Sequence, residues 1–251
     1  MFEEGKVSSC LQSFYEQSPC AEIIMPKDFQ LIAVTDAASC PRSLVEQVER
    51  IAVCPYKPHK LLLRAKDLDT EAYAHLAKNV QTICQKHDIE LIIHTHWQIA
   101  LELGVTQVHL PLPLLAQTPL EARQHLYLSS SVHSVEEAQK ALAEGAQALI
   151  AGHIYPTDCK AGVPPRGLEF LQQIYNVAVK HTTPTNPTIA EHFIPTKPQA
   201  NKKSHAHDRI ICPSPIPVYA IGGIRFDPSQ WQELAQHGAT GACIMSAYMH
   251  I

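Results

Sequence analysis

Eight short apolar segments alternate with segments of helical periodicity along most of this chain. Each apolar segment is bounded by polar residues, glycine or proline, as is typical of strands buried in a parallel sheet. The expected strands are Gln30–Thr35, Lys60–Arg64, Glu90–His94, Gln107–Leu110, Tyr127–Ser131, Ala148–Gly152, Pro217–Ile221 and Ala242–Met245. The expected helices are Ser43–Val53, Asp69–His87, Trp97–Leu103, Leu120–Gln124, Ser134–Glu144, Gly167–Lys180 and Pro228–His237. This alternation predicts an α/β fold, a (β/α)8 TIM barrel, with an open doubly wound sheet as the alternative.

The chain of 251 residues has the usual length of one such barrel, roughly 250 residues. We expect residues 1–28 to form an N-terminal arm and residues 29–251 to form the barrel domain. Residues 181–215 are rich in Thr, Pro, Asn, Lys and His, which predicts a flexible insertion before the seventh strand. Few residues follow the eighth strand, so we expect a truncated last helix and an uncovered flank that favours a homodimer.

Composition excludes several classes of partner. The formal net charge is -4 and the pI is about 6.4, so neither nucleic acid nor an anionic membrane surface is an expected partner. No run of 18 or more apolar residues occurs, which predicts a cytoplasmic protein without a membrane span. The eight cysteines form no CxxC pair and are expected to be reduced thiols.

The sixth expected strand, Ala148–Gly152, leads directly into a loop rich in reactive side chains. His153, Thr157, Cys159 and Lys160 follow it within a few residues. Reactive groups in parallel α/β folds lie just past the carboxyl ends of the strands, where rigid backbone delivers loop residues into one crevice. We therefore expect His153 and Lys160 to face that crevice, while Cys159 is an inert thiol more often than a nucleophile.

Other strand ends deliver further polar groups to the same rim. Arg64 and Lys66 follow the second strand, where they are either surface charges or anchors for an anionic substrate. Ser131 ends the fifth strand. His94 and His96 share a face and could recruit a metal, but no carboxylate obviously completes a ligand set, so we expect no metal site.

The seventh and eighth strands predict a phosphate site. The candidate phosphate-binding residues are Gly222, Gly223, Met245 and Ser246. Backbone N–H groups approach a phosphate closely where Cβ is absent, and the loops after strands seven and eight commonly bind phosphate in this fold. A plain tight turn is the alternative explanation for the glycine pair.

Several of these segments together resemble the thiamine phosphate synthase and TenI superfamily. The segments are Ile32–Asp36, Leu63–Lys66, Val108–Leu110, Ser131–Ala138, Ala151–Lys160, Pro165–Leu168, Ala220–Ile224 and Met245–Ala247. The resemblance covers about residues 30–247 except the insertion. It implies a TIM barrel of thiamine biosynthesis that binds a small-molecule thiazole phosphate.

The chain departs from the synthase pattern at two strand ends. The synthase joins hydroxymethylpyrimidine diphosphate to thiazole phosphate with Mg²⁺ held by acidic side chains. Where its Asn-Asp pair follows strand three, this chain has His94 and Thr95, and Pro111–Leu114 replaces its Gly-Gln-x-Asp. The resemblance therefore makes synthase activity, with Mg²⁺ as cofactor, the alternative function.

The loop after the sixth strand instead resembles TenI, the thiazole tautomerase. That resemblance implies an isomerase in which His153 is catalytic and shuttles the proton that aromatises a carboxylated thiazole phosphate, without a cofactor. Histidine titrates near neutrality, which suits this step. Arg64, Lys66, Ser131, Thr157, Cys159 and Lys160 would bind the substrate. A non-catalytic protein that binds thiazole or thiamine phosphates and regulates a partner is a second alternative.

Overall fold

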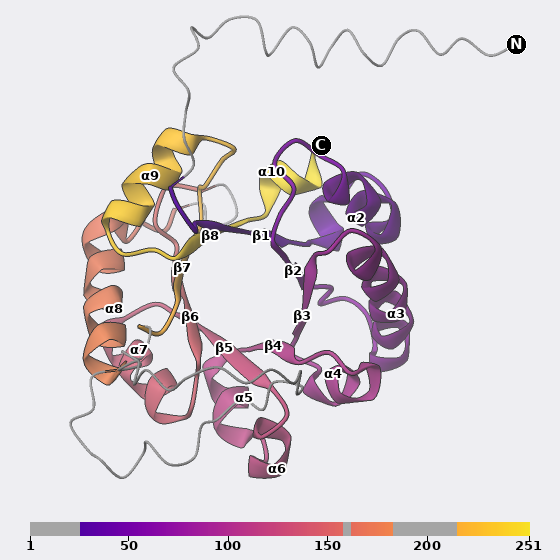
Figure 1. The fold of residues 1–251 in the computed structure, drawn as a ribbon, viewed down its shortest axis with the longest axis horizontal. Coiled ribbons are helices and arrows are strands. Elements are labelled where there is room, and N and C mark those ends of the chain that lie inside the picture. The colour runs from indigo at the N-terminus through magenta and orange to yellow at the C-terminus, as the bar shows by residue number, and fades with distance from the viewer. Residues whose placement is uncertain (1–25, 158–161, 183–214) are drawn as a thin grey trace, which may run out of the picture.

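The computed structural model describes residues 26–157, 162–182 and 215–251, and its strands form one closed parallel barrel (Figure 1). The strands are β1 Gln30–Val34, β2 Lys60–Leu63, β3 Glu90–His94, β4 Gln107–Leu110, β5 Tyr127–Val132, β6 Ala148–Gly152, β7 Val218–Ile221 and β8 Gly241–Ile244. Their order around the barrel follows the sequence, and β1 pairs with β8 as well as with β2. The TIM barrel is confirmed, and closure excludes the open doubly wound sheet.

Helices surround the barrel and begin and end close to the predicted residues. They are α2 Leu44–Ala52, α3 Thr70–Lys86, α4 Trp97–Leu103, α5 Leu112–Gln117, α6 Leu120–Arg123, α7 Val135–Ala143, α8 Gly167–Thr182, α9 Pro228–Gln236 and α10 Ser246–Met249, with a 3-10 turn, η1, at Ala37–Ser39. The side chains of Ser43, Asp69 and Ser134 each accept a hydrogen bond from a backbone N–H of the first turn. Such caps satisfy amides that the helix itself leaves unpaired.

One helix, α5, is not among the helices expected from the sequence. Residues 111–119 contain three prolines, and we expected no helix there, yet Leu112–Gln117 is helical as α5. Pro111 is the N-cap and Pro113 lies in the first turn, where the missing N–H and the fixed φ cost nothing. Proline here starts the helix.

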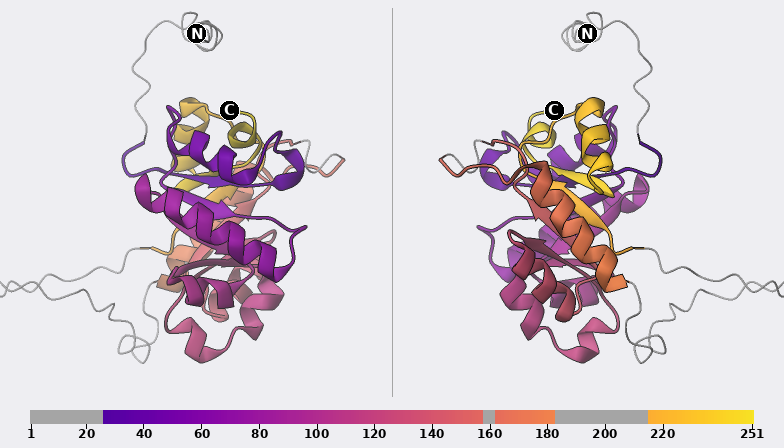
Figure 2. Two further views of the ribbon diagram at one scale, coloured as in Figure 1. Left: turned by 90° about the vertical axis from the view of Figure 1, so that its right-hand side faces the viewer. Right: turned by 90° about the vertical axis from the view of Figure 1, so that its left-hand side faces the viewer.

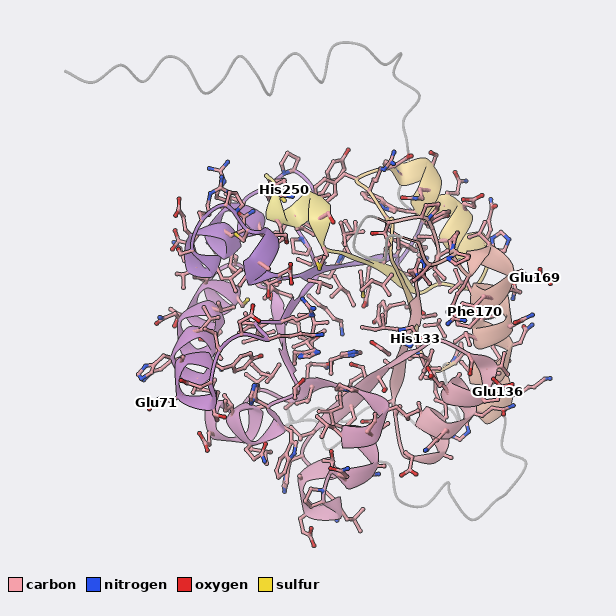
Figure 3. The ribbon with its side chains drawn as sticks, turned by 180° about the vertical axis from the view of Figure 1, so that it is seen from behind. Glu71, His133, Glu136, Glu169, Phe170 and His250 are labelled. Carbon is pink, nitrogen blue, oxygen red and sulfur yellow. The ribbon has the colours of Figure 1, made fainter. Side chains whose placement is uncertain are left out.

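Apolar side chains fill two layers. The larger layer lies between the strands and the helices, and a smaller one lies inside the barrel around Ile32, Leu62, Ile92 and Ile150. Seen from behind, side chains project from the strands into the barrel, while Glu71 and Glu169 point outward from the helices (Figure 3). The interior is therefore a packed core rather than a pore, and a ligand has room only at its mouth.

A single-turn helix and aromatic side chains occupy the place of the eighth helix. In Figure 1, α10 lies between α9 and α2. The Phe226 ring stacks on Tyr56 at 5.1 Å between centroids and meets Tyr248 edge-on at 4.7 Å. Trp231 is fully buried beside them. This cluster, with the hydrogen bond from the Tyr248 hydroxyl to the Tyr56 carbonyl, packs the flank that the short α10 leaves.

The loop after β6 and the start of β7 lie at opposite ends of the barrel (Figure 2). β7 begins at the amino-terminal end of the barrel strands. Residues 1–25 and 183–214, which hold most of the arm and of the insertion, lie outside the described residues. Among the described residues, no helix is long and apolar enough to cross a membrane.

Candidate active site

The exit of β2 holds Arg64 in a fixed backbone position. The Arg64 amide donates to the buried Thr35 hydroxyl at 2.8 Å, and that hydroxyl donates to the Arg64 carbonyl at 2.9 Å. The guanidinium forms a salt bridge with Asp36, which follows β1. Lys66, two residues on, is exposed. Arg64 is thus partly neutralised by Asp36, and Lys66 is the freer charge for an incoming anion.

Two histidines at the ends of β3 and β4 are held in the neutral state. Burial, with the nearby charges of Arg64 and Lys66, lowers the pKa of His94 to about 4. Burial and the neighbouring His94 lower the pKa of His109 to about 3. The two rings stack with centroids 5.9 Å apart. Near neutral pH both imidazoles therefore act as uncharged donors and acceptors of hydrogen bonds.

The depressed pKa of His109 predicts a loss of stability in acid. Because the unfolded chain binds this proton near pH 6.5 and the folded chain only near pH 3, stability is lost as the pH falls between those values. At pH 4 we expect His109 alone to lower the free energy of unfolding by about 3 kcal/mol relative to pH 7. Urea unfolding at pH 4 to 7 measures this slope, and His109→Gln should remove that share of it. An unchanged slope in the variant would show that His109 is not buried as the neutral form.

The side chains of His96 and His133 have other partners than the ring stack of His94 and His109. The His96 ring packs on Tyr73 with centroids 4.3 Å apart. The His133 backbone amide donates to the Glu137 carboxylate at 2.6 Å, while the Glu137 amide donates to the Ser134 hydroxyl at 3.1 Å. Ser134 thus caps α7, and the Glu137 carboxylate reaches back to the residue before the cap.

His153 is the most enclosed titratable group after β6. It is 4% exposed, and its backbone carbonyl accepts from the Arg166 amide at 3.0 Å. The flanking backbone continues the pairing with β7, because the Ile154 amide donates to the Ile221 carbonyl at 2.9 Å. In the imidazole, Nε2 lies 3.3 Å from the Val163 carbonyl oxygen. Among the buried side-chain nitrogen and oxygen atoms that the structure describes, only Nδ1 of His153 has no hydrogen-bond partner.

The glycine pair after β7 packs against this loop. A Cβ on Gly222 would lie 2.2 Å from the His153 Cβ, and one on Gly223 would lie 2.4 Å from the Pro156 carbonyl oxygen. Both glycines have positive φ, 97° and 69°. Close approach of the two loops therefore explains the glycine pair.

Of the other residues predicted to bind substrate or phosphate, some are described by the structure and some are not. Met245 and Ser246 follow β8, directly beside β7 in the barrel, so they lie near the glycine pair. Thr157 is half-buried in the loop after β6. Cys159 and Lys160 lie outside the described residues. The barrel order places β6, β7 and β8 together. β6 lies opposite β2, whereas β8 is separated from β2 only by β1.

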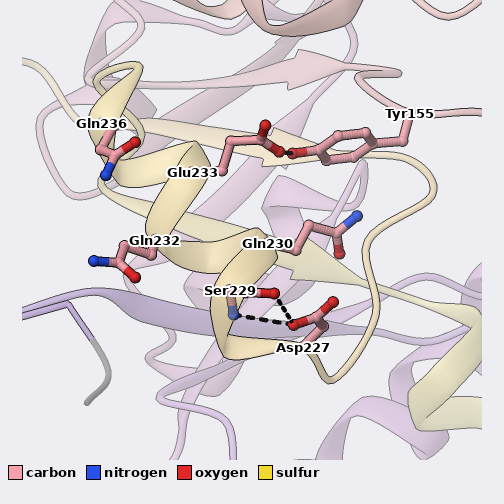
Figure 4. Close-up of a pocket in the computed structure, with 7 residues that line it drawn as sticks. All are labelled: Tyr155, Asp227, Ser229, Gln230, Gln232, Glu233 and Gln236. Carbon is pink, nitrogen blue, oxygen red and sulfur yellow. Dashed lines mark hydrogen bonds between the residues drawn. The ribbon is translucent and has the colours of Figure 1, made fainter. Parts of the chain in front are cut away.

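A surface pocket of about 510 Å³ lies behind the loop after β6 (Figure 4). Tyr155 lines it together with residues of α9, and the Tyr155 hydroxyl donates to the Glu233 carboxylate at 2.7 Å. Asp227 contributes a second carboxylate. Two carboxylates make this pocket unsuited to a phosphate, and its polar contacts anchor the loop that carries His153.

The donor set does not fit a magnesium ion. Among the described residues, no three His, Cys, Asp or Glu side chains are grouped so that they could hold a metal ion. Asp36, the acid after β1, pairs with Arg64. Magnesium requires carboxylate oxygens, which the ends of β3 and β4 do not supply.

The sequence analysis did not single out a hydrogen-bonded group between β4 and β5. His109 lies between the hydroxyls of Ser129 and Ser131, at 2.9 Å and 2.8 Å. A signal was present, because polar residues recur with period two in both strands, Gln107 with His109 and Ser129 with Ser131. This period places them on the inner face of the barrel.

Comparison with known proteins agrees with this architecture. The family model described as thiamine monophosphate synthase matches residues 31–190. A thiamine-phosphate synthase of Synechocystis is 29% identical over 189 residues, which cover 74% of this chain but 44% of that protein. One of Pyrococcus horikoshii is 27% identical over 188 residues, 74% of this chain and 72% of that protein. The solved thiamine phosphate pyrophosphorylase of Pyrococcus furiosus matches with a TM-score of 0.62 and 24% identity over 89% of both chains.

Proposed function

This chain belongs to the thiamine monophosphate synthase family, and we propose that it is a thiazole tautomerase that aromatises a carboxylated thiazole phosphate. The family comprises enzymes of thiamine biosynthesis, so a small phosphorylated heterocycle is the expected kind of substrate. His153 is the residue that moves the proton. The free nitrogen of His153 is the observation that carries the proposal.

The tautomer of His153 follows from its one hydrogen bond. A carbonyl oxygen only accepts, so the Nε2 that faces the Val163 carbonyl carries the hydrogen. Nδ1 therefore holds a lone pair, and this lone pair is buried without a partner. A buried polar atom left unpaired costs about 1–3 kcal/mol, so its retention is a signal of function. In the proposed reaction Nδ1 takes a proton from the substrate ring and returns it at another ring position.

The arrangement of the mouth supports a ligand with two anionic groups. Gly222, Gly223 and Ser246 would hold the phosphate beside His153, on the β7 and β8 side. Arg64 and Lys66 would meet the carboxylate from the β2 side of the mouth. Cys159, Lys160 and Thr157 belong to the same loop as His153 and remain proposed substrate contacts. We also propose that the protein forms a homodimer.

Thiamine-phosphate synthase activity is the second candidate. The names of the relatives favour it, since the curated proteins from Synechocystis and Pyrococcus horikoshii are both thiamine-phosphate synthases. The donor set weighs against it, because the ends of β3 and β4 supply His94, Thr95 and the start of α5 in place of carboxylates. The tautomerase needs one titratable group and no cation, which matches the residues present.

Absorbance-followed aromatisation in EDTA separates the candidates. We expect the purified protein to aromatise the carboxylated thiazole phosphate tautomer at an unchanged rate when EDTA replaces Mg²⁺. In parallel, hydroxymethylpyrimidine diphosphate and thiazole phosphate are supplied with Mg²⁺ and thiamine phosphate is measured. Coupling without aromatisation would replace the tautomerase with the synthase. Neither reaction, with tight binding of thiazole phosphate, would make the protein a binder.

A further inference from the structure

The first turn of α9 holds the loop after β7 through the side chain of Gln230. The Gln230 amide nitrogen donates to the Gly223 carbonyl at 3.2 Å, and its amide oxygen accepts from the Arg225 backbone N–H at 2.9 Å. A backbone carbonyl only accepts and a backbone N–H only donates, so the two bonds together fix the orientation of the side-chain amide. The indole N–H of Trp231 donates to the Arg225 carbonyl at 2.9 Å. α9 therefore holds the backbone of residues 223–225 at three atoms.

Both carbonyls of the glycine pair face other parts of the protein. The Gly222 carbonyl accepts from the Tyr155 backbone N–H at 3.0 Å, while the Gly223 carbonyl accepts from Gln230. The two peptide bonds that follow these carbonyls are trans, so each N–H points away from the carbonyl of its own peptide unit. The Gly223 N–H thus points away from Tyr155, and the Ile224 N–H points away from α9. Among the described residues, neither N–H has a hydrogen-bond partner.

We propose that Gln230 is a positioning residue that holds the Gly223–Ile224 peptide with its N–H towards the ligand phosphate. α9 lies outside the barrel in Figure 1, so an N–H that points away from α9 points back towards the barrel. Successive backbone N–H groups of this kind form binding sites for anions. The inference rests on the proposed function in taking the glycine pair as the phosphate site. Gln230 acts on the ligand only through this peptide.

A glycine loop needs such a contact because its peptides have several accessible orientations. Gly223 has a φ of 69°, and without a Cβ it populates both signs of φ. If the peptide after Gly223 turned over, its carbonyl oxygen would take the place of the Ile224 N–H and would repel an anion. The hydrogen bond from Gln230 to the Gly223 carbonyl stabilises the orientation that a phosphate requires.

The same face of α9 also holds the loop that carries His153. Glu233 lies three residues after Gln230, and its carboxylate accepts from the Tyr155 hydroxyl at 2.7 Å. In Figure 4, the Gln230 and Glu233 side chains both extend from α9 on the side of Tyr155. The helix therefore contacts both loops of the proposed site, and Gln230 is its contact with the glycine pair.

Titration of the wild-type chain with inorganic phosphate is the first measurement, followed by nitrogen-15 correlation spectra. The Ile224 amide proton should move downfield as phosphate binds, because a hydrogen bond to an anion deshields the proton. The Arg225 amide proton, which is already bound to Gln230, should move less. Phosphate binding that leaves the Ile224 resonance in place would overturn the proposal.

Gln230→Met is the second measurement, because it removes both side-chain hydrogen bonds with little change in volume. The dissociation constant of thiazole phosphate should rise about tenfold, as expected when one hydrogen bond to a charged group is weakened. The unphosphorylated thiazole alcohol should bind to the variant and the wild type equally. Gln232→Met is the matched control, because Gln232 is exposed on the same helix and should keep the wild-type affinity for both ligands.

Two results would contradict the inference. An equal loss of affinity for the phosphate and the alcohol would show that Gln230 only supports the fold. An unchanged affinity for thiazole phosphate would show that the peptide keeps its orientation without Gln230. Neither result would alter aromatisation by the wild type, and the binding measurements need no turnover, so the inference and the proposed function fail separately.

Discussion

His153→Gln is expected to lower kcat for aromatisation by about a hundredfold or more, since a positioned acid–base group contributes roughly 10²–10⁴-fold. Glutamine keeps an amide that can donate to the Val163 carbonyl, where Nε2 of His153 now lies. The glutamine amide cannot take up and release a proton as an imidazole can, so the proposed proton transfer loses its carrier. KM should change little, because the proposed substrate contacts of Arg64, Lys66 and the glycine pair would remain.

The measurement is steady-state aromatisation, with thermal unfolding recorded for each variant. His75→Gln is the matched control, because His75 is exposed on α3 outside the barrel and should retain the wild-type rate. A folded His153→Gln protein with kcat within about threefold of the wild type would be incompatible with general acid–base catalysis by His153.

Most of the fold could be predicted from the sequence because its signals are local. Trp97–Leu103 was predicted with both bounds, since Gly104 ends that helix in a left-handed conformation with φ of 68°. The α5 helix was missed because prolines usually interrupt helices, and their position within the first turn decides otherwise. Closure of the sheet into a barrel could be predicted only from the count of eight strands, because the apolar pattern of each strand would be the same in an open parallel sheet.

The candidate site could be predicted as a set of residues at strand ends, but the contacts among their side chains could not. Which residue follows each strand is a property of the sequence, so Arg64, Ser131 and His153 could be assigned to the rim. The pairing of Arg64 with Asp36 depends on side chains from two strands. The neutral state of His109 depends on burial and on the neighbouring His94. Such relations arise only when distant segments pack together.

Gly222→Ala is expected to lower the free energy of unfolding by about 3 kcal/mol or more. The left-handed backbone, with φ of 97°, costs a residue with a Cβ about 1–2 kcal/mol, and overpacking adds about 1–3 kcal/mol. The new methyl would lie 2.2 Å from the His153 Cβ and 2.8 Å from its Cα. Neither atom belongs to the flexible end of a side chain, so relief requires the loop after β6 to move.

Gly104→Ala separates backbone strain from this contact. Gly104 has φ of 68° and no atom within 4 Å of an added Cβ, so its substitution should cost only about 1–2 kcal/mol. Urea unfolding of both variants at pH 7 measures the difference. Because movement of the loop displaces His153, Gly222→Ala should also lose aromatisation activity, whereas Gly104→Ala should keep it. Equal destabilisation by the two substitutions would show that the two loops do not pack as closely as these contacts require.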